Sequence, residues 1–447
     1  MRSAVSRAAS KAVEKRNRTA GEYPYWQTMR EQAHAVKRRV MENLDDFLLQ
    51  FEEKCRENGI RVHWAQDAEE ARETVGTIAA EHGVKQVVKS KSLTTEEIGL
   101  NRYLQKNQIE VTETDLGEYI VQLLDQIPSH LTAPALHLDR KDIGRVFHEK
   151  LGVDYTEEPA ELLAIARQKL RKKMLNADMG ITGVNFAIAD SGCLCVVENE
   201  ANARLSLGVP DVHVAVMGIE KIIPSFSELD TFLKLLPASA TGQKQTVYVD
   251  VVGGPLFPAI GEGARNVHVI ILDNGRSRIL ADPQLRETLF CIRCGACLNI
   301  CPVYRQIGGH AYGWVYMGPI GACLIPQYNG ISAGRHAPFI SSLCGACAQQ
   351  CPVQISIPHH LTRLRYDVAK QGYTAWWERY ALKLHAFLCR YPLLYRALTW
   401  FPGKLQQLLP GDMRFPAPGY TRDRALGRFD SKGFRRRFLK MQRQQDL

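Results

Sequence analysis

The chain of 447 residues has no uninterrupted run of about 20 apolar residues, which is the length that a membrane-spanning helix needs. Arg390 and Arg396 interrupt the best candidate. Residues 1–18 lack the apolar core of a secretory signal, and Glu14 argues against a transit peptide although the segment is rich in Arg and Ser. We therefore expect a cytoplasmic protein, with peripheral association at the inner face of the membrane as the alternative.

Nucleotide-binding signatures are also missing. The segment GEGARN (261–266) has only G-x-G and lacks the third glycine of a dinucleotide fingerprint, and there is no P-loop. We therefore expect no flavin or nicotinamide in a Rossmann pocket, so that two-electron chemistry would lie on a partner. Hydrophobic residues make up 45% and charged residues 23% of the chain, which excludes a disordered protein. The length indicates two or three domains.

The positive charge of the chain is concentrated at one end. Lys and Arg total 57 against 47 Asp and Glu, a net charge of +10. Residues 361–447 hold 18 basic and 6 acidic residues, a net of +12, whereas residues 1–360 hold 39 and 41. Aromatic and aliphatic residues recur in this tail at roughly helical spacing. Its apolar face could pack on its own protein, on a partner subunit or on a membrane surface. Nucleic acid is the weakest interpretation, because the body is nearly neutral.

The pattern along the chain predicts four segments. Residues 1–70 look helical, and residues 71–285 alternate helices with short strands, which is typical of an α/β sheet with helices on its faces. Residues 286–360 are rich in Cys and Gly and predict a mainly α-helical ferredoxin-like module. Residues 361–447 form the basic amphipathic helical tail. Strands are expected within 84–90, 109–114, 185–198, 212–218, 245–253 and 266–273.

Twelve cysteines in so long a chain do not indicate a disulfide framework, and their spacing carries the information. One motif is C-x2-C-x2-C-x3-C-P and a second repeats its last three cysteines; together they contain Cys291, Cys294, Cys297, Cys301, Cys344, Cys347 and Cys351. This is the spacing of two-cluster ferredoxins, in which the fourth Cys of each motif binds the other cluster. Gly295 and Gly345 permit the backbone to wrap a cluster and to aim N–H groups at sulfur. Zinc sites instead use paired C-x2-C units separated by a longer loop.

The crossed pattern predicts the ligands of two iron–sulfur clusters, which we expect to be 4Fe-4S. Cluster 1 takes Cys291, Cys294, Cys297 and Cys351, and cluster 2 takes Cys301, Cys344 and Cys347. The fourth ligand of cluster 2 is open, because Ser341 stands where the second motif should have a Cys. Cys323, a Ser341 oxygen or a 3Fe-4S cluster without that corner are the alternatives, and Cys323 could equally be a small buried residue. The other four cysteines are expected to be structural or incidental: Cys55, Cys193, Cys195 and Cys389.

Several stretches beyond the cysteines resemble one family. In the α/β part these are KSKSLTTEEIGLN (89–101), VTETDLGEYIVQL (111–123), PSHLTAPALHLDR (128–140), GITGVNFAIADSG (180–192), ENEANARL (198–205) and GIEKIIPS (218–225). In the cysteine-rich part they are CIRCGACLNICPVYRQIGGHAYG (291–313) and SSLCGACAQQCPV (341–353). Over nearly its whole length the chain resembles the lactate utilisation protein B family, the iron–sulfur subunits of bacterial L-lactate oxidation.

The resemblance implies a lactate-utilisation domain, of the isomerase and CoA-transferase type, fused to a ferredoxin-like module. It implies two partner subunits, one cysteine-rich and one with only the α/β domain, and growth on lactate through its oxidation to pyruvate. The family tends to carry Ser at the Ser341 position, which favours a site-differentiated cluster. The chain itself would be a non-catalytic electron-transfer subunit, with L-lactate or the electron acceptor reached through the complex.

Two alternatives to this function stay open. The clusters could serve another 2-hydroxy acid, glycerol phosphate or a heterodisulfide. In a different class, the chain could be an α/β ligand-binding or isomerase-type enzyme whose clusters are structural or sensory.

The α/β part offers weaker candidates. A helix is expected to start near Thr94 or Thr95, which would cap it with Glu97 as the capping-box partner. Lys89 and Lys91 beside this helix start could bind an anion, or the segment could be an ordinary capped helix. His213 is expected to be a core or turn residue, and His310 could tune a cluster by hydrogen bonding. A polar run follows a predicted strand, where α/β sheets place ligands, and it is otherwise a solvated turn. That run is Glu198, Asn199, Glu200, Asn202 and Arg204.

Overall fold

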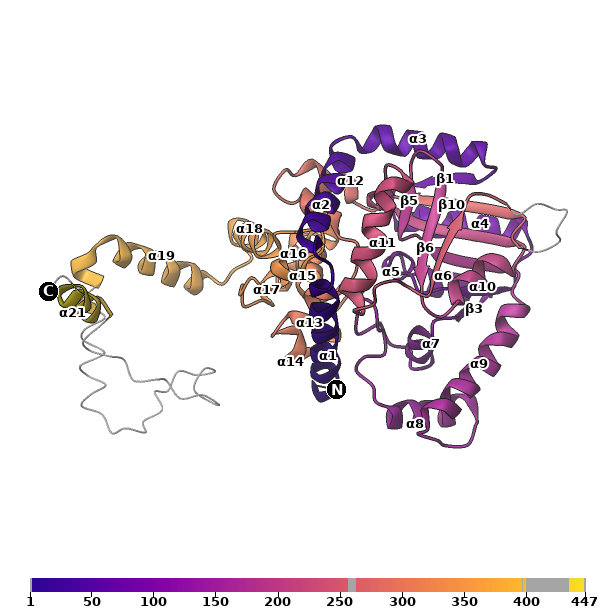
Figure 1. Cartoon of the computed structure of the whole chain (residues 1–447), viewed down its shortest axis with the longest axis horizontal. Helices are drawn as coiled ribbons and strands as arrows, with labels where there is room; N and C mark the ends of the chain where they lie inside the picture. Colours follow the sequence, from indigo (N-terminus) through magenta and orange to yellow (C-terminus); the bar gives the residue numbers. More distant parts are fainter. Residues whose placement is uncertain (1, 256–262, 396, 399–433, 446–447) are drawn as a thin grey trace. The chain divides into compact units, whose positions relative to one another are not determined.

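The computed structural model describes residues 2–255, 263–395, 397–398 and 434–445 (Figure 1). The chain divides into two compact units, Met1–Val368 and Ala369–Leu447. Residues 261–262 of the segment GEGARN and residues 399–433 of the basic tail, for which sequence-based expectations were made, lie outside the described residues.

The first unit is built on a six-stranded parallel sheet, which confirms the α/β class. The strand order is β1-β10-β7-β4-β2-β3, and every neighbouring pair is parallel. Its members are β1 (Arg61–Ala65), β2 (Gln86–Lys89), β3 (Glu110–Glu113), β4 (Met179–Gly183), β7 (Val212–Gly218) and β10 (Asn266–Leu272). Strands β7 and β10 read as nearly continuous apolar runs because both of their faces are buried.

Alternating side chains of each central strand serve two hydrophobic cores. Val212, Val214 and Val216 of β7 pack in the core that contains α4 (Ala68–Glu81) and α6 (Leu100–Lys106). Ala215 and Met217 point to the opposite face and join a larger core. The larger core also contains residues of η1 (Ile219–Lys221), of α11 (Phe226–Ala240) and of the N-terminal helices.

A second, four-stranded sheet has the order β8-β5-β6-β9. It consists of β8 (Ile222–Ile223), β5 (Phe186–Ile188), β6 (Cys193–Glu198) and β9 (Tyr248–Val252). Cys193 and Cys195 lie on β6 as expected, and Cys195 is buried opposite Phe186. Neither belongs to the two cysteine motifs.

The N-terminal segment folds as α1 (Arg2–Gly21), α2 (Trp26–Glu42) and α3 (Leu44–Glu57). It differs from the helical expectation for residues 1–70 at β1, which pairs with β10 at the edge of the main sheet. The Cys55 sulfur on α3 is buried and donates a hydrogen bond to the Gly192 carbonyl at 3.2 Å.

Further helices connect and cover the strands. They are α5 (Leu93–Glu97), α7 (Leu116–Leu123), α8 (Arg140–Leu151), α9 (Pro159–Leu175), α10 (Asn202–Gly208) and α12 (Arg276–Ala281). The expected cap of α5 is wrong: Ser92 is the N-cap, and its hydroxyl accepts from the Thr95 amide at 3.3 Å. Glu97 is no capping-box partner, because its carboxylate is committed to Arg276.

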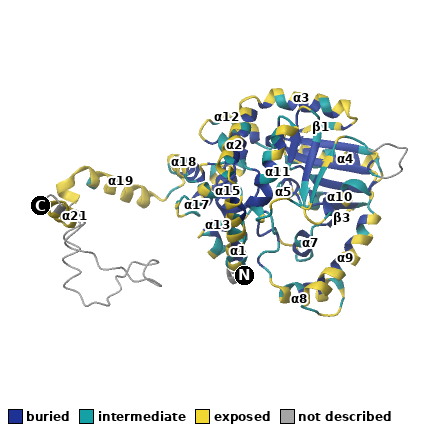
Figure 2. Ribbon diagram, viewed as in Figure 1, coloured by how far each residue is buried: buried dark blue, intermediate teal, exposed yellow. Residues whose placement is uncertain are grey.

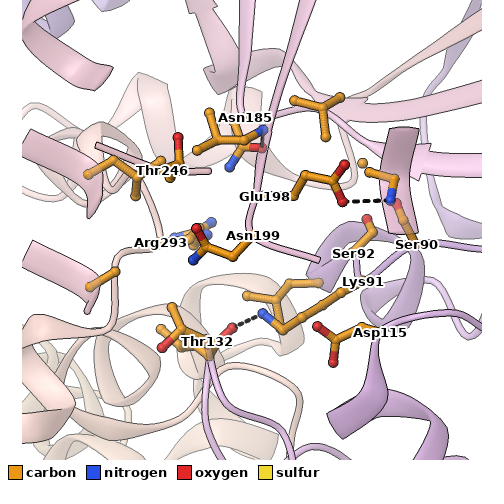
Figure 3. Close-up of a pocket in the computed structure, with 18 of the residues that line it drawn as sticks. Ser90, Lys91, Ser92, Asp115, Thr132, Asn185, Glu198, Asn199, Thr246 and Arg293 are labelled. Carbon is orange, nitrogen blue, oxygen red and sulfur yellow. Dashed lines mark hydrogen bonds between the residues drawn. The ribbon is translucent and has the colours of Figure 1, made fainter. Parts of the chain in front are cut away.

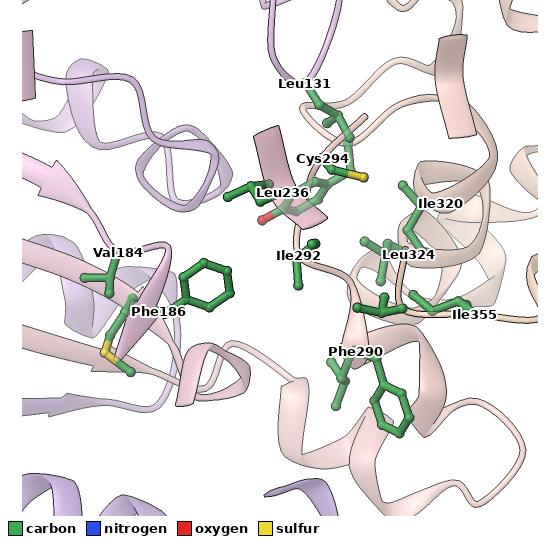
Figure 4. Close-up of a cluster of buried hydrophobic side chains, with 14 of the residues drawn as sticks. Leu131, Val184, Phe186, Leu236, Phe290, Ile292, Cys294, Ile320, Leu324 and Ile355 are labelled. Carbon is green, nitrogen blue, oxygen red and sulfur yellow. The ribbon is translucent and has the colours of Figure 1, made fainter. Parts of the chain in front are cut away.

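The cysteine-rich region consists of short helices that share the larger core of the α/β domain. They are η2 (Arg286–Phe290), α13 (Ala296–Ile300), α14 (Tyr304–Ile307), η3 (His310–Tyr312), α15 (Gly318–Asn329), α16 (Ile331–Gly334), η4 (Ala337–Phe339), α17 (Ala346–Gln350) and α18 (Ile357–Lys370). Figure 4 shows Phe186 and Leu236 of the α/β domain in one hydrophobic cluster with Ile292, Ile320 and Ile355. The two regions are therefore held together by a continuous apolar interior.

The second unit contains α19 (Trp376–Arg390) and α21 (Phe434–Gln445). No residue of α19 is buried, and Figure 2 shows the helix exposed along its length. Trp376 and Trp377 are 69% and 61% exposed. Within the described residues, no helix is both long and apolar enough to cross a membrane.

Candidate functional site

The two cysteine motifs adopt the same backbone conformation. Arg293 and Gly295 in the first motif have φ of 62° and 76°, and Leu343 and Gly345 in the second have φ of 55° and 84°. Such angles are costly for residues other than glycine, so the repeated left-handed turns indicate a wrapping that both motifs need. The short helices that follow, α13 and α17, contact each other.

Four cysteines line one cavity between the motifs. Three come from the first motif and one from the second: Cys291, Cys294, Cys297 and Cys351. Apolar side chains such as Leu131, Ile320 and Ile357 complete the wall. Burial raises the pKa of Cys351 to about 12 and raises the pKa of Cys294 and Cys297 as well. Thiols in this setting become thiolates only when a bound cation replaces their protons.

The remaining three motif cysteines form a second group. They lie close enough together that a negative charge on Cys344 would raise the pKa of Cys301, and a charge on either would raise the pKa of Cys347. Burial raises the pKa of Cys347 to about 11, whereas Cys344 is exposed and a hydrogen bond from the Ala346 amide lowers its pKa. This group therefore lies closer to the surface than the first one.

The surroundings of the sulfur atoms fit iron–sulfur clusters. The Tyr304 amide donates to the Cys301 sulfur at 3.5 Å, and the Ile355 amide donates to the Cys351 sulfur at 3.3 Å. Four thiols around one shared cavity match the ligand set of a multi-iron cluster.

The N-terminal helices place two arginines beside the first group. Arg30 of α2 donates from Nε and Nη2 to the Cys351 carbonyl at 3.0 and 2.8 Å. Arg16 of α1 donates to the Gln350 carbonyl at 3.3 Å. Their positive charge would compensate the negative charge of a thiolate-ligated cluster, a role that the sequence of this segment did not indicate.

The two candidates for a fourth ligand of the second group lie in different surroundings. Cys323 on α15 is fully buried, and its sulfur donates weakly to the Ile357 carbonyl at 3.9 Å. The Ser341 hydroxyl is half-buried and accepts from the Leu343 amide at 3.1 Å. Ser341 precedes Cys344 by the same interval as Cys291 precedes Cys294.

A second, more polar cavity of about 270 Å³ lies at the carboxyl edge of the main sheet. Its walls include the segments that follow β2, β3 and β4, and Lys221, which ends η1 after β7. The predicted polar run after β6 contributes Glu198, Asn199, Glu200 and Asn202, so it does line a cavity. Residues of α11, such as Leu236, and Ile292 and Arg293 of the first cysteine motif also line it. Figure 3 shows Lys91, Glu198 and Arg293 around this space.

The two lysines that were predicted to bind an anion lie in different surroundings. Lys91 lines the cavity and donates to the Leu131 carbonyl, whereas Lys89 is buried against Glu96 and Glu113 at 3.0 and 2.7 Å. Lys89 therefore cannot serve a ligand.

The two histidine candidates both have protein partners. His213 is a core residue, as expected: it bonds the Thr182 hydroxyl at 2.9 Å, and burial lowers its pKa to about 3. His310 bonds the Ile127 carbonyl at 2.9 Å, so its Nε2 atom is engaged away from the cysteines.

A buried ion network joins the sheet to the cysteine-rich region. Arg276 lies between Glu97 at 2.9 Å and Glu220 at 2.6 Å, all almost fully buried, and Arg293 reaches Glu220 at 3.5 Å. Burial by itself would raise the pKa of Glu220, but Arg276 and Arg293 lower it to about 2. Gly218 is required here, since a Cβ atom would lie 2.0 Å from the Glu220 carboxylate. Sequence reasoning missed this network, and the one available signal was a basic residue inside an otherwise apolar cysteine motif.

The fold and the site define the class: an α/β domain that shares its core with a two-cluster iron–sulfur module. In agreement, the LUD domain model matches residues 48–272, and the 4Fe-4S dicluster domain model matches residues 287–355. The protein thus carries iron–sulfur clusters of the 4Fe-4S type.

Similar proteins narrow the class to one family. Lactate utilization protein B of Bacillus velezensis is 42% identical over 94% of this chain and 88% of its own length. Lactate utilization protein B of Bacillus cereus (strain AH820) is 43% identical over 89% and 84%. The uncharacterized electron transport protein YkgF of Escherichia coli (strain K12) is 41% identical over 100% and 94%. The chain belongs to the lactate utilisation protein B family.

Proposed function

We propose that this chain is the iron–sulfur electron-transfer subunit of a complex that oxidises L-lactate to pyruvate. The observation that carries the electron-transfer part is the cavity that Cys291, Cys294, Cys297 and Cys351 line together. Lactate enters the proposal through the names of the Bacillus relatives. Oxidation of lactate releases two electrons, and two clusters that each pass one electron at a time form a suitable relay.

The proposed ligands follow the two groups in the structure. Cluster 1 is held by Cys291, Cys294, Cys297 and Cys351, and cluster 2 is held by Cys301, Cys344 and Cys347. The clusters supply reversible one-electron storage when bound. The chain supplies a dry apolar shell around cluster 1, amide donors to sulfur and the positive charges of Arg16 and Arg30.

The segment boundaries and the partners belong to the same proposal. The sequence places the α/β domain at residues 71–285, but β1 (Arg61–Ala65) pairs within the main sheet, so we extend the domain to include this strand. The cluster module spans 286–360 and the basic tail 361–447. A cysteine-rich subunit and a second α/β subunit complete the complex. The exposed aromatic face of α19 offers a surface on which a partner can pack.

L-lactate should reduce the clusters of the assembled complex. The chain is purified without oxygen, mixed with its two partner subunits, and followed by electron paramagnetic resonance after addition of L-lactate. We expect the signals of reduced clusters to appear in the complex and to stay weak in the isolated chain. Clusters that accept electrons from dithionite but never from lactate would contradict the proposed function.

Cluster 2 is proposed to have a distinctive fourth iron on the side of Ser341. We expect Cys323→Ala to leave the iron content and the spectrum of cluster 2 unchanged, because the Cys323 sulfur is buried against the Ile357 carbonyl. Ser341→Cys should instead alter the spectrum of cluster 2 by adding a fourth thiolate. Loss of iron in Cys323→Ala would show instead that Cys323 is the fourth ligand of cluster 2.

A further inference from the structure

The polar cavity at the carboxyl edge of the main sheet has one wall with two cationic side chains. Arg293 lines the cavity and is 8% exposed, its Nη1 atom is buried without a hydrogen-bond partner, and its contact with Glu220 is long at 3.5 Å. Lys221 also lines the cavity and is half-buried. A buried guanidinium with a free N–H group calls for an acceptor, and a carboxylate is the best geometric match.

The charge balance behind this wall also favours an anion. Two other buried basic side chains lie near Glu220 with Arg293. Lys37 donates to the Glu220 backbone carbonyl, and Arg276 takes the Glu97 and Glu220 carboxylates at close range. With Lys221, four basic groups face two carboxylates. The proposed cluster 1 lies next to this wall, because Arg293 stands between Cys291 and Cys294 in the sequence. The negative charge of the cluster would offset part of the excess positive charge of the wall.

The opposite wall of the cavity carries acidic and hydroxyl side chains. Asp115, Glu198 and Glu200 line it together with Ser90, Lys91 and Ser92. The Glu198 carboxylate is already held by the Ala203 and Arg204 amides at 2.7 and 2.9 Å, so it is fixed in place. A ligand with a negative end and a hydroxyl or keto end would therefore be oriented across the cavity.

The size of the cavity limits the ligand. About 270 Å³ lies just below the range of pockets that hold drug-sized molecules, so the space suits a small metabolite and not a dinucleotide. Its position at the carboxyl ends of neighbouring parallel strands is the usual ligand site of α/β sheets.

We propose that this cavity binds a small 2-hydroxy or 2-oxo carboxylate, with the carboxylate at Arg293 and Lys221 and the second oxygen towards the serines and the acidic wall. The inference rests on the proposed function for the choice of L-lactate and pyruvate as ligands. It places the organic acid in this chain, beside cluster 1, and not in a partner subunit. Arg293 and Lys221 act here as binding residues.

The test is calorimetry on the iron-loaded full chain under anaerobic conditions. L-Lactate and pyruvate are titrated, with propionate as the analogue that lacks the second oxygen and inorganic phosphate as a different anion. We expect lactate and pyruvate to bind more tightly than propionate or phosphate. Arg293→Gln and Lys221→Gln should each weaken binding about tenfold or more, since each removes a charged hydrogen-bond donor. Lys173→Gln, which removes an exposed lysine paired with Glu110, is the matched control and should bind normally.

Arg293 lies between two proposed cluster ligands, so its variant could lose cluster 1. Lys221→Gln keeps the inference falsifiable in that event, because Lys221 stands outside the motif. Unchanged affinity in Lys221→Gln with full iron content, no binding of either acid, or equal binding of phosphate would overturn the cavity assignment.

The same variants separate this inference from the proposed function. If lactate reduces the clusters of the complex and Lys221→Gln leaves the half-saturating lactate concentration unchanged, the electron-transfer function stands and the cavity assignment falls. If the variants weaken binding but lactate never reduces the clusters, the cavity stands and the function falls.

Discussion

Cys351→Ala is expected to remove cluster 1, although Cys351 belongs to the second motif. Iron should fall from about eight to about four atoms per chain, and the lost signal should be the one that Cys294→Ala also removes. The reason is geometric: Cys351 lines one cavity with the first three cysteines of the other motif. Alanine is preferred to serine because a serine oxygen can still bind iron.

Iron and sulfide analysis and the spectrum of the dithionite-reduced chain measure this result. Cys301→Ala is the reciprocal variant, since it lies in the first motif and should remove cluster 2. Cys389→Ala, at an exposed position outside the motifs, should keep all of the iron. The crossed assignment is wrong if Cys351→Ala and Cys344→Ala remove the same signal.

Arg276→Met is expected to destabilise the first unit by about 3 to 5 kcal/mol, because it leaves the buried carboxylates of Glu97 and Glu220 without their main counter-ion. For a unit of this size the loss corresponds to a fall in Tm of about 4 to 6 °C. Methionine fills much of the space of the arginine stem, so the effect reports the charge and not a large void.

Thermal unfolding of the iron-loaded chain, followed by circular dichroism without oxygen, measures the change. Arg145→Met is the matched control: Arg145 pairs with Asp142 on the surface, where ion pairs contribute about 0 to 1 kcal/mol. Its Tm should shift by about 1 °C or less. A Tm of Arg276→Met that equals the Tm of this control would show that the network contributes little to stability.

The strands and the cysteine motifs illustrate what could be predicted. β7 and β10 were visible as apolar runs, because a strand buried on both faces has apolar residues at nearly every position. β1, β4 and β8 were not predicted: β1 carries partly exposed residues, β4 is rich in glycine, and β8 has two residues. Their strand geometry comes from neighbours that supply hydrogen bonds and burial.

The polar candidates show which parts of the site could not be predicted from the sequence. Lys91, Thr94 and the run after β6 were singled out for their places at a helix start and after a strand, and the sheet brings them to one cavity. Lys89 looked equally suitable, yet it is the last residue of β2 and is buried against Glu113 of the neighbouring strand, whereas Lys91 lies beyond the strand. Glu97 was assigned to a helix cap because Arg276, almost 180 positions away in sequence, could not be foreseen as its partner.

The sequence by itself determined the cofactor class, since three cysteines at intervals of three followed by C-P have the spacing of iron–sulfur ligands. It also determined the α/β class through its alternating elements. Only the tertiary structure decided that Arg16 and Arg30 bond the backbone at Gln350 and Cys351 and that Arg293 lines a cavity of the α/β domain. Those contacts join residues from distant parts of the chain, and a shared hydrophobic core, which no local pattern encodes, sets where they meet.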